Sequence, residues 1–433
     1  MKKIIYAAGV LSLGGAQVAV QAAEGEPKTW SLGLSAQGFY DDNINTAPNG
    51  PNKVGSWGSL VTPSANYSQA WDQTSVRLGA SYGAYYFANT RNNQGQTLLD
   101  DNWSQTANVN VGVEHTFNPR LTLDVNDSFA VFQNASQVLL GQTGRINGNN
   151  INNIAVANLS AELSNRFSVV LGYENDLFQY QNDVFAALLD RVENYGKLDL
   201  RYLVNTKTVA VVGTKSGNVS YDRNLGLANV SAAPNSLTNP SSGLKNNDSY
   251  FVYGGFDHSF APSLTGSLRA GAQIQEFYNY NSGYYQALPA GSSLQTQVNP
   301  YVDVNLKYGF TAGSSAVIGV IHRSNPSDVN GQPVNGVFMP TLQAVSTALY
   351  TSVNHAITSK LSGSLLGTFQ NSEYVGGYSG YMENWWSVGA TASYQVVRNL
   401  AVTVSYYYDL LNSQVPGRQY DRNRVFFGFS ASY

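Results

Sequence analysis

Charged side chains stand at alternate positions in several stretches of this sequence. Lys197, Asp199 and Arg201 are separated by Leu198 and Leu200. Alternate residues of a β-strand point to opposite faces, so the three charges would share one face. Acids and bases on one face could set a local field across a passage for polar solutes. They could equally pair across neighbouring strands and only hold a wall together.

The sequence offers little for catalysis. Its four histidines, His115, His258, His322 and His355, are widely spaced. Ser259 follows His258 directly, but neighbours in a strand point to opposite faces, so no Ser–His pair is expected. There is no metal-ligand spacing, no phosphate-binding glycine loop and no cysteine. A thiol nucleophile, a disulfide and a lipoprotein anchor are therefore excluded, and we expect neither an enzyme nor a cofactor or metal.

The N-terminal residues have the form of a signal peptide. Lys2 and Lys3 precede an apolar run over residues 4–13, and Val20-Gln21-Ala22-Ala23 suits cleavage after Ala22 or Ala23. We therefore expect residues 1–23 to be removed and residues 24–433 to form one domain.

The composition suits a wall between lipid and water. Charged residues are 12% of the chain, against about 25% in average proteins. Without Lys2 and Lys3, the 24 bases become 22 against 27 acids, a net charge of −5. An acidic chain does not favour a nucleic-acid partner.

Period-two alternation recurs along the chain. Residues 121–126 (Leu-Thr-Leu-Asp-Val-Asn) alternate, as do residues 298–308. No stretch beyond the signal peptide has about 20 consecutive apolar residues, the length of a membrane helix. Transmembrane β-barrels show this combination.

The expected connections alternate between short and long. Short turns are predicted at 118–120, 164–166, 205–207, 261–263, 358–360 and 397–399. Long polar segments are predicted at 42–55, 88–102, 134–153, 222–248, 278–296 and 323–337, with shorter ones near 181–190, 372–382 and 412–420. Outer-membrane barrels place short turns in the periplasm and long loops outside. The sequence therefore predicts an all-β, antiparallel up-and-down transmembrane barrel of about 18 strands, with 16 as the alternative.

The end of the sequence alternates as well. Tyr433, Ala431, Phe429, Phe427 and Val425 share one face of the predicted last strand. We expect these residues to form the signal that the barrel-assembly machinery reads.

One short segment carries a family resemblance. Residues 34–44 run into Tyr40-Asp41-Asp42-Asn43-Ile44, which resembles the start of the Putative beta-barrel porin 2 family, a family that overlaps with EpsL-like outer-membrane proteins. The resemblance implies an outer-membrane barrel, and some members are associated with exopolysaccharide production. No site residue is carried over from the family.

The Tyr-Asp-x-Asn pattern recurs at 221–224 and 420–423. Asp and Asn at such strand edges are expected to satisfy backbone groups in turns. A calcium site at Asp41, Asp42 and Asn43 is the less favoured alternative, since Ca²⁺ requires six or more oxygen ligands.

If the apolar parity faces lipid, the other parity faces the interior. This assigns eleven charged residues to the lumen: Arg77, Glu114, Asp124, Glu174, Lys197, Asp199, Arg201, Arg269, Asp303, Lys307 and Asp409. Asp127 is an exception because it shares parity with Leu123 and Val125. A bulge or a place near a loop would explain it.

Six aromatic residues are also assigned to the interior, where they could stack sugars, although more of them are expected in interfacial girdles. They are Tyr85, Tyr195, Tyr253, Tyr301, Trp385 and Tyr407.

A barrel of 16–18 strands is wide enough for a water-filled channel. We therefore expect a porin-like channel in the Gram-negative outer membrane for passive diffusion of small hydrophilic solutes. The alternatives are a polysaccharide export or secretion accessory barrel and a plugged surface-interaction barrel. Expected partners are outer-membrane lipid and lipopolysaccharide, the barrel-assembly machinery, and small polar solutes or oligosaccharides. A homo-oligomer is compatible with the sequence.

Overall fold

The computed structural model describes residues 29–91, 101–132, 150–181, 186, 189–221, 242–277, 295–329, 331–334 and 337–433. The predicted signal peptide lies outside these residues. In the described part of the chain, no helix has the length and apolar character needed to cross a membrane.

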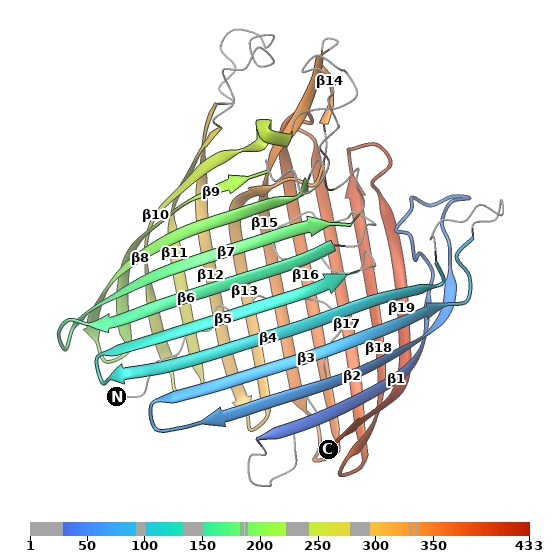
Figure 1. The fold of residues 1–433 in the computed structure, drawn as a ribbon, viewed down its shortest axis with the longest axis horizontal. Coiled ribbons are helices and arrows are strands. Elements are labelled where there is room, and N and C mark those ends of the chain that lie inside the picture. The colour runs from blue at the N-terminus through green and yellow to red at the C-terminus, as the bar shows by residue number, and fades with distance from the viewer. Residues whose placement is uncertain are drawn as a thin grey trace.

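Strands make up almost all of the described chain (Figure 1). They are β1 (Trp30–Asp41), β2 (Ser56–Ala70), β3 (Thr74–Phe87), β4 (Trp103–Asn118), β5 (Leu121–Phe132), β6 (Asn150–Glu162), β7 (Phe167–Tyr180), β8 (Arg191–Asn205), β9 (Thr208–Ser220), β10 (Asn247–Ala261), β11 (Leu264–Phe277), β12 (Thr296–Thr311), β13 (Ser314–Pro326), β14 (Gly331–Val334), β15 (Val337–Ala356), β16 (Leu361–Gly376), β17 (Met382–Val397), β18 (Leu400–Ser413) and β19 (Tyr420–Ser432). One 3-10 helix, η1 (Ser242–Lys245), precedes β10.

The sheet closes on itself. Each strand pairs antiparallel with its neighbour, and β1 pairs with both β2 and β19. β13 pairs directly with β15, while β14 pairs only with β15. All 19 described strands except β14 therefore form the wall, which confirms the predicted 18-strand barrel.

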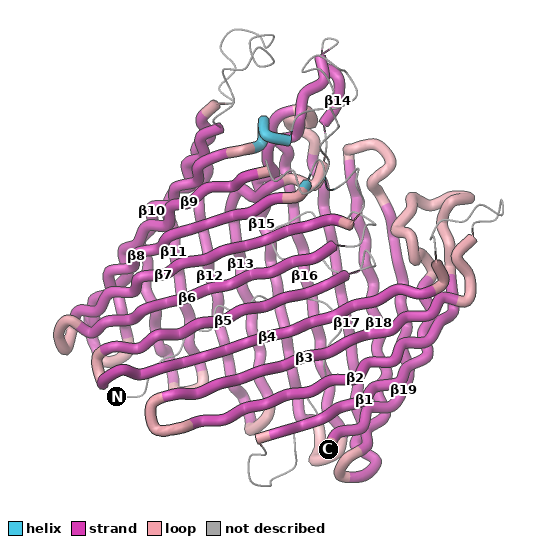
Figure 2. Tube along the Cα trace, viewed as in Figure 1, coloured by secondary structure: helices cyan, strands magenta, loops and turns pink. Residues whose placement is uncertain are grey.

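The connections separate by length at the two ends of the barrel. Eight short turns join β2 to β3, β4 to β5 and so on to β17 and β18, and the longer segments join the other neighbours. Two of these turns, 71–73 and 312–313, were not among those predicted from the sequence. η1 and β14 lie at the end opposite to the start of β1 and the end of β19 (Figures 1 and 2). This is the long-loop end, which outer-membrane barrels place outside the cell.

The strand register gives the wall two chemically different faces. Trp30, Leu32 and Leu34 are exposed on one face of β1, whereas Phe39 and Asp41 are buried on the other. The exposed parity continues from strand to strand and back to β1 without a break, because β19 meets β1 in matching register. The outer face can therefore contact lipid along the whole circumference.

Asp127 keeps the outer parity that the sequence pattern gives it. It lies opposite Val111 and Ala155, and β5 has no bulge at this position. Its Oδ1 accepts a hydrogen bond from Nδ2 of Asn153 at 2.7 Å. A polar neighbour on the outer face, rather than a bulge, satisfies this carboxylate.

The Tyr-Asp-x-Asn segments at residues 40–43 and 420–423 meet where the first strand, β1, pairs with the last strand, β19. Arg422 donates through Nε to both oxygens of Asp41 at 3.0 Å, and its Nη2 contacts Asp41 as well. Both side chains are only 3% exposed. The carboxylate of Asp41 also accepts the backbone N–H of Asn43 at 3.0 Å, so the predicted local turn bond is only part of its role.

Further contacts of the same segments join the two strands. Asn423 donates to Asp42 through its backbone N at 2.7 Å and through Nδ2 at 2.8 Å. Asn43 donates through Nδ2 to the backbone oxygen of Asp421 at 2.8 Å. Lys53 forms ion pairs with Asp421 at 3.0 Å and Asp42 at 3.4 Å. We call this group the seam cluster: Asp41, Asp42, Asn43, Lys53, Asp421, Arg422 and Asn423.

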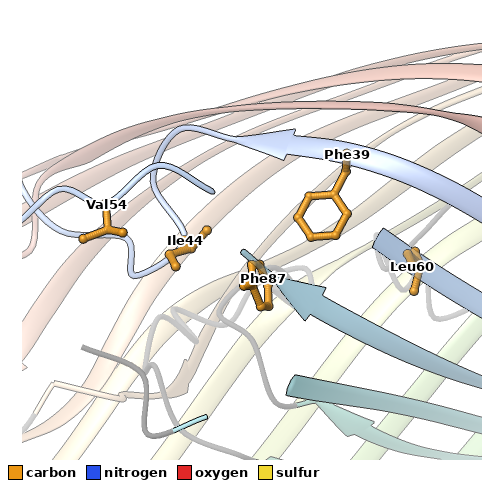
Figure 3. Close-up of a cluster of buried hydrophobic side chains, with 5 residues drawn as sticks. All are labelled: Phe39, Ile44, Val54, Leu60 and Phe87. Carbon is orange, nitrogen blue, oxygen red and sulfur yellow. The ribbon is translucent and has the colours of Figure 1, made fainter. Parts of the chain in front are cut away.

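An apolar cluster packs beside the seam cluster (Figure 3). Phe39 of β1, Leu60 of β2 and Phe87 of β3 contribute from the inner face. Ile44 and Val54 come from the connection between β1 and β2, so burying them ties that connection to the wall. The core of this barrel thus consists of local clusters on the inner face.

Candidate functional site

The largest group of charges on the inner face lies on strands β7 to β12. Lys215 of β9 contacts both oxygens of Glu174 on β7 at 2.9 Å. This contact crosses over β8, which only side chains on the concave side of the wall can do. Lys215 Nζ also lies 4.0 Å from the ring centroid of Tyr195, a distance at which a cation is attracted to the ring face.

Asp199 on β8 is the centre of a second group. It pairs with Lys197 at 3.2 Å and Arg201 at 3.7 Å. Tyr253 of β10 donates its hydroxyl to Asp199 at 2.6 Å. Tyr253 reaches across β9 because Gly213 stands between them, where a Cβ would lie 2.3 Å from Asp199 Oδ1.

Burial distinguishes the members of this wall. The side chain of Asp199 is 1% exposed, whereas those of Lys197 and Glu174 are 37% and 30% exposed. The acid at the centre is held by its partners, and the neighbouring charges keep solvent contact. We call this group the wall cluster: Glu174, Tyr195, Lys197, Asp199, Arg201, Lys215 and Tyr253.

The register places all eleven charged residues predicted for the lumen on the face opposite to the exposed apolar parity. It brings together Lys197, Asp199 and Arg201, and it aligns Arg269 with Asp303 and Glu114 with Asp124. That these residues contact a passing solute stays a prediction.

The remaining predicted residues are spread over other parts of the wall. Arg77 lies near the pair of acids on β4 and β5. Lys307 lies opposite Thr265 and Val317 toward the short-turn end. Asp409 belongs to a different sector, where it accepts hydrogen bonds from Arg424 at 2.6 Å and Ser387 at 2.7 Å.

The six interior aromatic residues also share the inner parity. Tyr195, Tyr253 and Trp385 are buried. Tyr253 packs against Tyr301 at 5.6 Å, and Phe251 lies 5.2 Å from Tyr301. These rings pack on one another and form no exposed stacking track on this wall.

Five charged residues of strands β7 to β10 were missed from the sequence: Asp176, Arg191, Glu193, Lys215 and Asp257. Lys215 follows Val209 and Val211 at the same parity, so the apolar residues of this stretch wrongly assign this parity to the lipid-facing side. Asp257, which pairs with Arg269 at 2.8 Å, lies on β10, where large apolar residues occupy both parities. Parity identifies an interior charge only where the interior positions are polar.

The outer end of the barrel carries a second group of contacts. Residues Ser327, Asp328 and Val329, which follow β13, are all buried, and we call them the strap. Lys245 at the end of η1 donates through Nζ to the backbone oxygen of Ser327 at 3.2 Å. Arg418, between β18 and β19, contacts Asp328 at 3.2 Å.

The strands beside these two anchors lie on nearly opposite sides of the ring. Eight strands, β10–β13 and β15–β18, separate η1 from Arg418. Eight strands occupy about 38 Å of wall, while three residues span at most about 10 Å. The strap and the two connections therefore meet over the outer mouth.

Arg418 also ties the strap to the wall. Its Nε donates to Glu383 Oε1 at 2.6 Å, and Glu383 accepts the hydroxyls of Tyr374 and Ser413. Val329 packs with Tyr374 and Val415. On the opposite side, burial lowers the pKa of Lys245 to about 7, because a charged ammonium is costly away from water.

Val425, Phe427, Phe429 and Ala431 of β19 are exposed on the outer parity, and Tyr433, directly after the strand, is exposed as well. Their reading by the assembly machinery stays a prediction. Among the described residues, no group of three or more His, Asp or Glu side chains is placed to hold a metal ion.

A family model described as Putative beta-barrel porin 2 matches residues 334–433, which run from the end of β14 through β19. This is the family that residues 34–44 resemble. The chain has no match among curated protein sequences.

Solved structures with a similar fold include three with low sequence identity. A BenF-like porin from Pseudomonas fluorescens Pf-5 is 10% identical with a TM-score of 0.46, and the match covers 94% of this chain and 100% of that one. OccK8 (OprE) of Pseudomonas aeruginosa is 11% identical with a TM-score of 0.44, covering 93% and 98%. Copper transporter OprC is 12% identical with a TM-score of 0.39, and the match covers 90% of this chain but only 64% of OprC.

The closed wall, its apolar exterior and the family match together define the class. This protein is a closed transmembrane β-barrel, and its residues 334–433 match a family model of β-barrel porins.

Proposed function

We propose that this barrel is a channel through which small hydrophilic solutes diffuse passively along the wall cluster. The observation that carries the proposal is the solvent contact of Lys197 and Glu174 on the inner face. Charges at that position would be fully buried if side chains filled the barrel at this level.

Both signs of charge lie side by side in the wall cluster. A solute passing it would meet ammonium, guanidinium and carboxylate groups held in fixed positions. Such an arrangement suits small polar solutes in general and favours neither cations nor anions strongly. Entry from outside would be limited by the strap.

The strap also supports a second candidate, a surface-interaction barrel with a closed lumen. Its contacts with Lys245 and Arg418 would then be permanent. The third candidate, a polysaccharide export barrel, receives less support because the interior rings of β8 and β10 are buried.

Single-channel recording of the refolded chain in a planar bilayer separates these candidates. Stable openings in salt solution are expected for the diffusion channel. Silence in every condition that leaves the barrel folded would contradict it. Blockage by added oligosaccharide would favour the polysaccharide route.

A further inference from the structure

The two rims of the barrel differ in charge. The eight short turns, all of them described, contain five bases and one acid, Asp72; the bases are Arg120, Arg166, Lys207, Lys360 and Arg398. By sequence, the nine longer segments contain seven acids (Asp42, Asp100, Asp101, Asp183, Asp190, Asp222, Asp328) and six bases (Lys53, Arg91, Arg145, Arg223, Lys245, Arg418). The short-turn rim thus has a net charge of +4, against −1 for the segments of the other end. Positive charge gathers at the periplasmic rim.

This basic rim borders exposed rings on the outer face. Phe117, Phe167 and Phe260 are exposed within three residues of a short turn. Arg166 Nη1 lies 3.4 Å from the hydroxyl of Tyr202, whose ring packs 4.8 Å from Phe167. Amphipathic rings of this kind sit at the level of lipid headgroups. The bases next to them are therefore placed at headgroup level.

Three histidines on the same rim share one arrangement. Nδ1 of His115 lies 2.8 Å from Thr74 Oγ1, that of His258 lies 2.8 Å from Thr208 Oγ1, and that of His355 lies 3.0 Å from Ser314 Oγ. In each pair the hydroxyl belongs to the neighbouring strand and engages Nδ1. In the part of the chain that the structure describes, Nε2 of these rings makes no hydrogen bond.

Each of these rings also packs against a phenylalanine. The ring centroids of His115 and Phe117, and of His258 and Phe260, are 4.5 Å apart, and those of His355 and Phe310 are 5.3 Å apart. The hydroxyl and the phenylalanine together fix the imidazole at the edge of the apolar band.

At one of the three positions a turn base joins the histidine. Lys207 directly precedes Thr208, and its backbone oxygen accepts the N–H of Ser259 at 2.8 Å. The turn that carries Lys207 therefore lies against His258. Lys207, Thr208 and His258 are therefore neighbours on this rim, beside the exposed ring of Phe260.

We propose that the short-turn rim binds the phosphate groups of anionic phospholipids, and that Lys207, Thr208 and His258 form its strongest site. The ammonium, the hydroxyl and Nε2 of the imidazole supply hydrogen bonds to a phosphate, and the rim supplies positive charge. The acyl chains of the same lipid then lie on the apolar outer face below Phe260. The occupant is a lipid because the site opens onto this face.

The test measures lipid retained by the full-length refolded barrel. The protein is equilibrated in mixed micelles with equal amounts of phosphatidylglycerol and phosphatidylcholine, and bound lipids are counted by native mass spectrometry. We expect retention of phosphatidylglycerol over phosphatidylcholine. K207Q should weaken phosphatidylglycerol binding by about fivefold, and K207Q/H258Q should weaken it further because the hydrogen bond from the imidazole is lost as well.

The matched control is R91Q, which removes a base at the other end of the barrel. Folding of each variant is checked by the change in gel mobility on boiling, and K207Q alone serves if the double variant does not fold. Equal retention of the two lipids by the parent protein would overturn the proposal. So would an equal loss of phosphatidylglycerol in R91Q and K207Q.

Discussion

Two arginines four residues apart, Arg418 and Arg422, make ion pairs of different kinds at the outer end. Arg422 pairs with Asp41 on the adjacent strand, and both side chains are 3% exposed. Arg418 pairs with Asp328 in the strap and is 16% exposed. Arg422 thus stabilises the contact between the first and last strands, and Arg418 holds the strap in place at the outer mouth.

The difference follows from where the partners lie. Asp41 is fixed by the ladder between β1 and β19, so its pair with Arg422 is part of the barrel and can break only if the wall opens. Asp328 lies in a connection, so its pair with Arg418 can break while the wall stays intact. An Arg–Asp ion pair thus stabilises the closed barrel at Arg422 and the position of the strap at Arg418.

The largest effect is expected from removing the seam pair. R422A leaves the Asp41 carboxylate buried without its cation, which costs about 3–5 kcal/mol. Gel mobility shifts followed against temperature and urea should show a clear loss of stability. D41A/R422A removes both charges and should recover part of the loss. If the double variant were as unstable as the sum of both single variants, the pair would not be the cause.

R418A should change conduction more than folding. Losing hydrogen bonds to charged groups costs about 1–3 kcal/mol. Here the loss destabilises the conformation in which Lys245 and Arg418 hold the strap, which we call the strapped state, and leaves the wall intact. A contact worth about 1.4 kcal/mol changes the ratio of open to closed channels about tenfold. Single-channel open probability measures this, with R91A as the control. An unchanged open probability would place the strap away from the passage.

Acidification should act on the mouth through Lys245. Burial lowers the pKa of Lys245 to about 7 from an ordinary 10.5, and Asp328, Arg191 and Tyr221 lie around it. Above pH 7 the amine of Lys245 is neutral when it is buried and protonated when it is released from the strap. Release therefore takes up a proton, so the strapped state becomes more stable as pH rises and less stable as pH falls toward 6. Between pH 8 and pH 6, open probability should rise by at most about tenfold. K245M should remove the dependence, and a persistent pH response in K245M would assign it to another group.

The smallest effect is expected in the wall cluster, which contacts neither the Arg422–Asp41 pair nor the Arg418–Asp328 pair. K215Q leaves Glu174 without its ammonium partner and should favour cations, and E174Q should favour anions. Partly exposed pairs are worth up to about 1 kcal/mol, so the permeability ratio should change by about two- to fivefold. Reversal potentials in a salt gradient measure it. Shifts in the same direction for both variants would remove the wall cluster from the solute path.

Much of the architecture could be predicted from local patterns. Alternation such as that of Leu198 and Leu200 with Lys197 and Asp199 assigns the faces of a strand, because the period of a strand is two. The pattern was uninformative on β9, where Val209 and Val211 occupy the inner face before Lys215. There the interior positions next to Lys215 are themselves apolar, so the alternation of polar and apolar residues does not distinguish the inner face from the outer face.

The sequence by itself predicted the barrel, about 18 strands with 16 as the alternative, and the face of most residues, because these depend on periodicity and on the spacing of turns. Only the tertiary structure decided the partners of the charges. Asp41 and Arg422 are separated by 381 positions, and Asp328 and Arg418 by 90. The first pair forms because β1 meets β19 when the barrel closes, and the second because the strap lies against the connection that carries Arg418. No local pattern in the sequence contains this information.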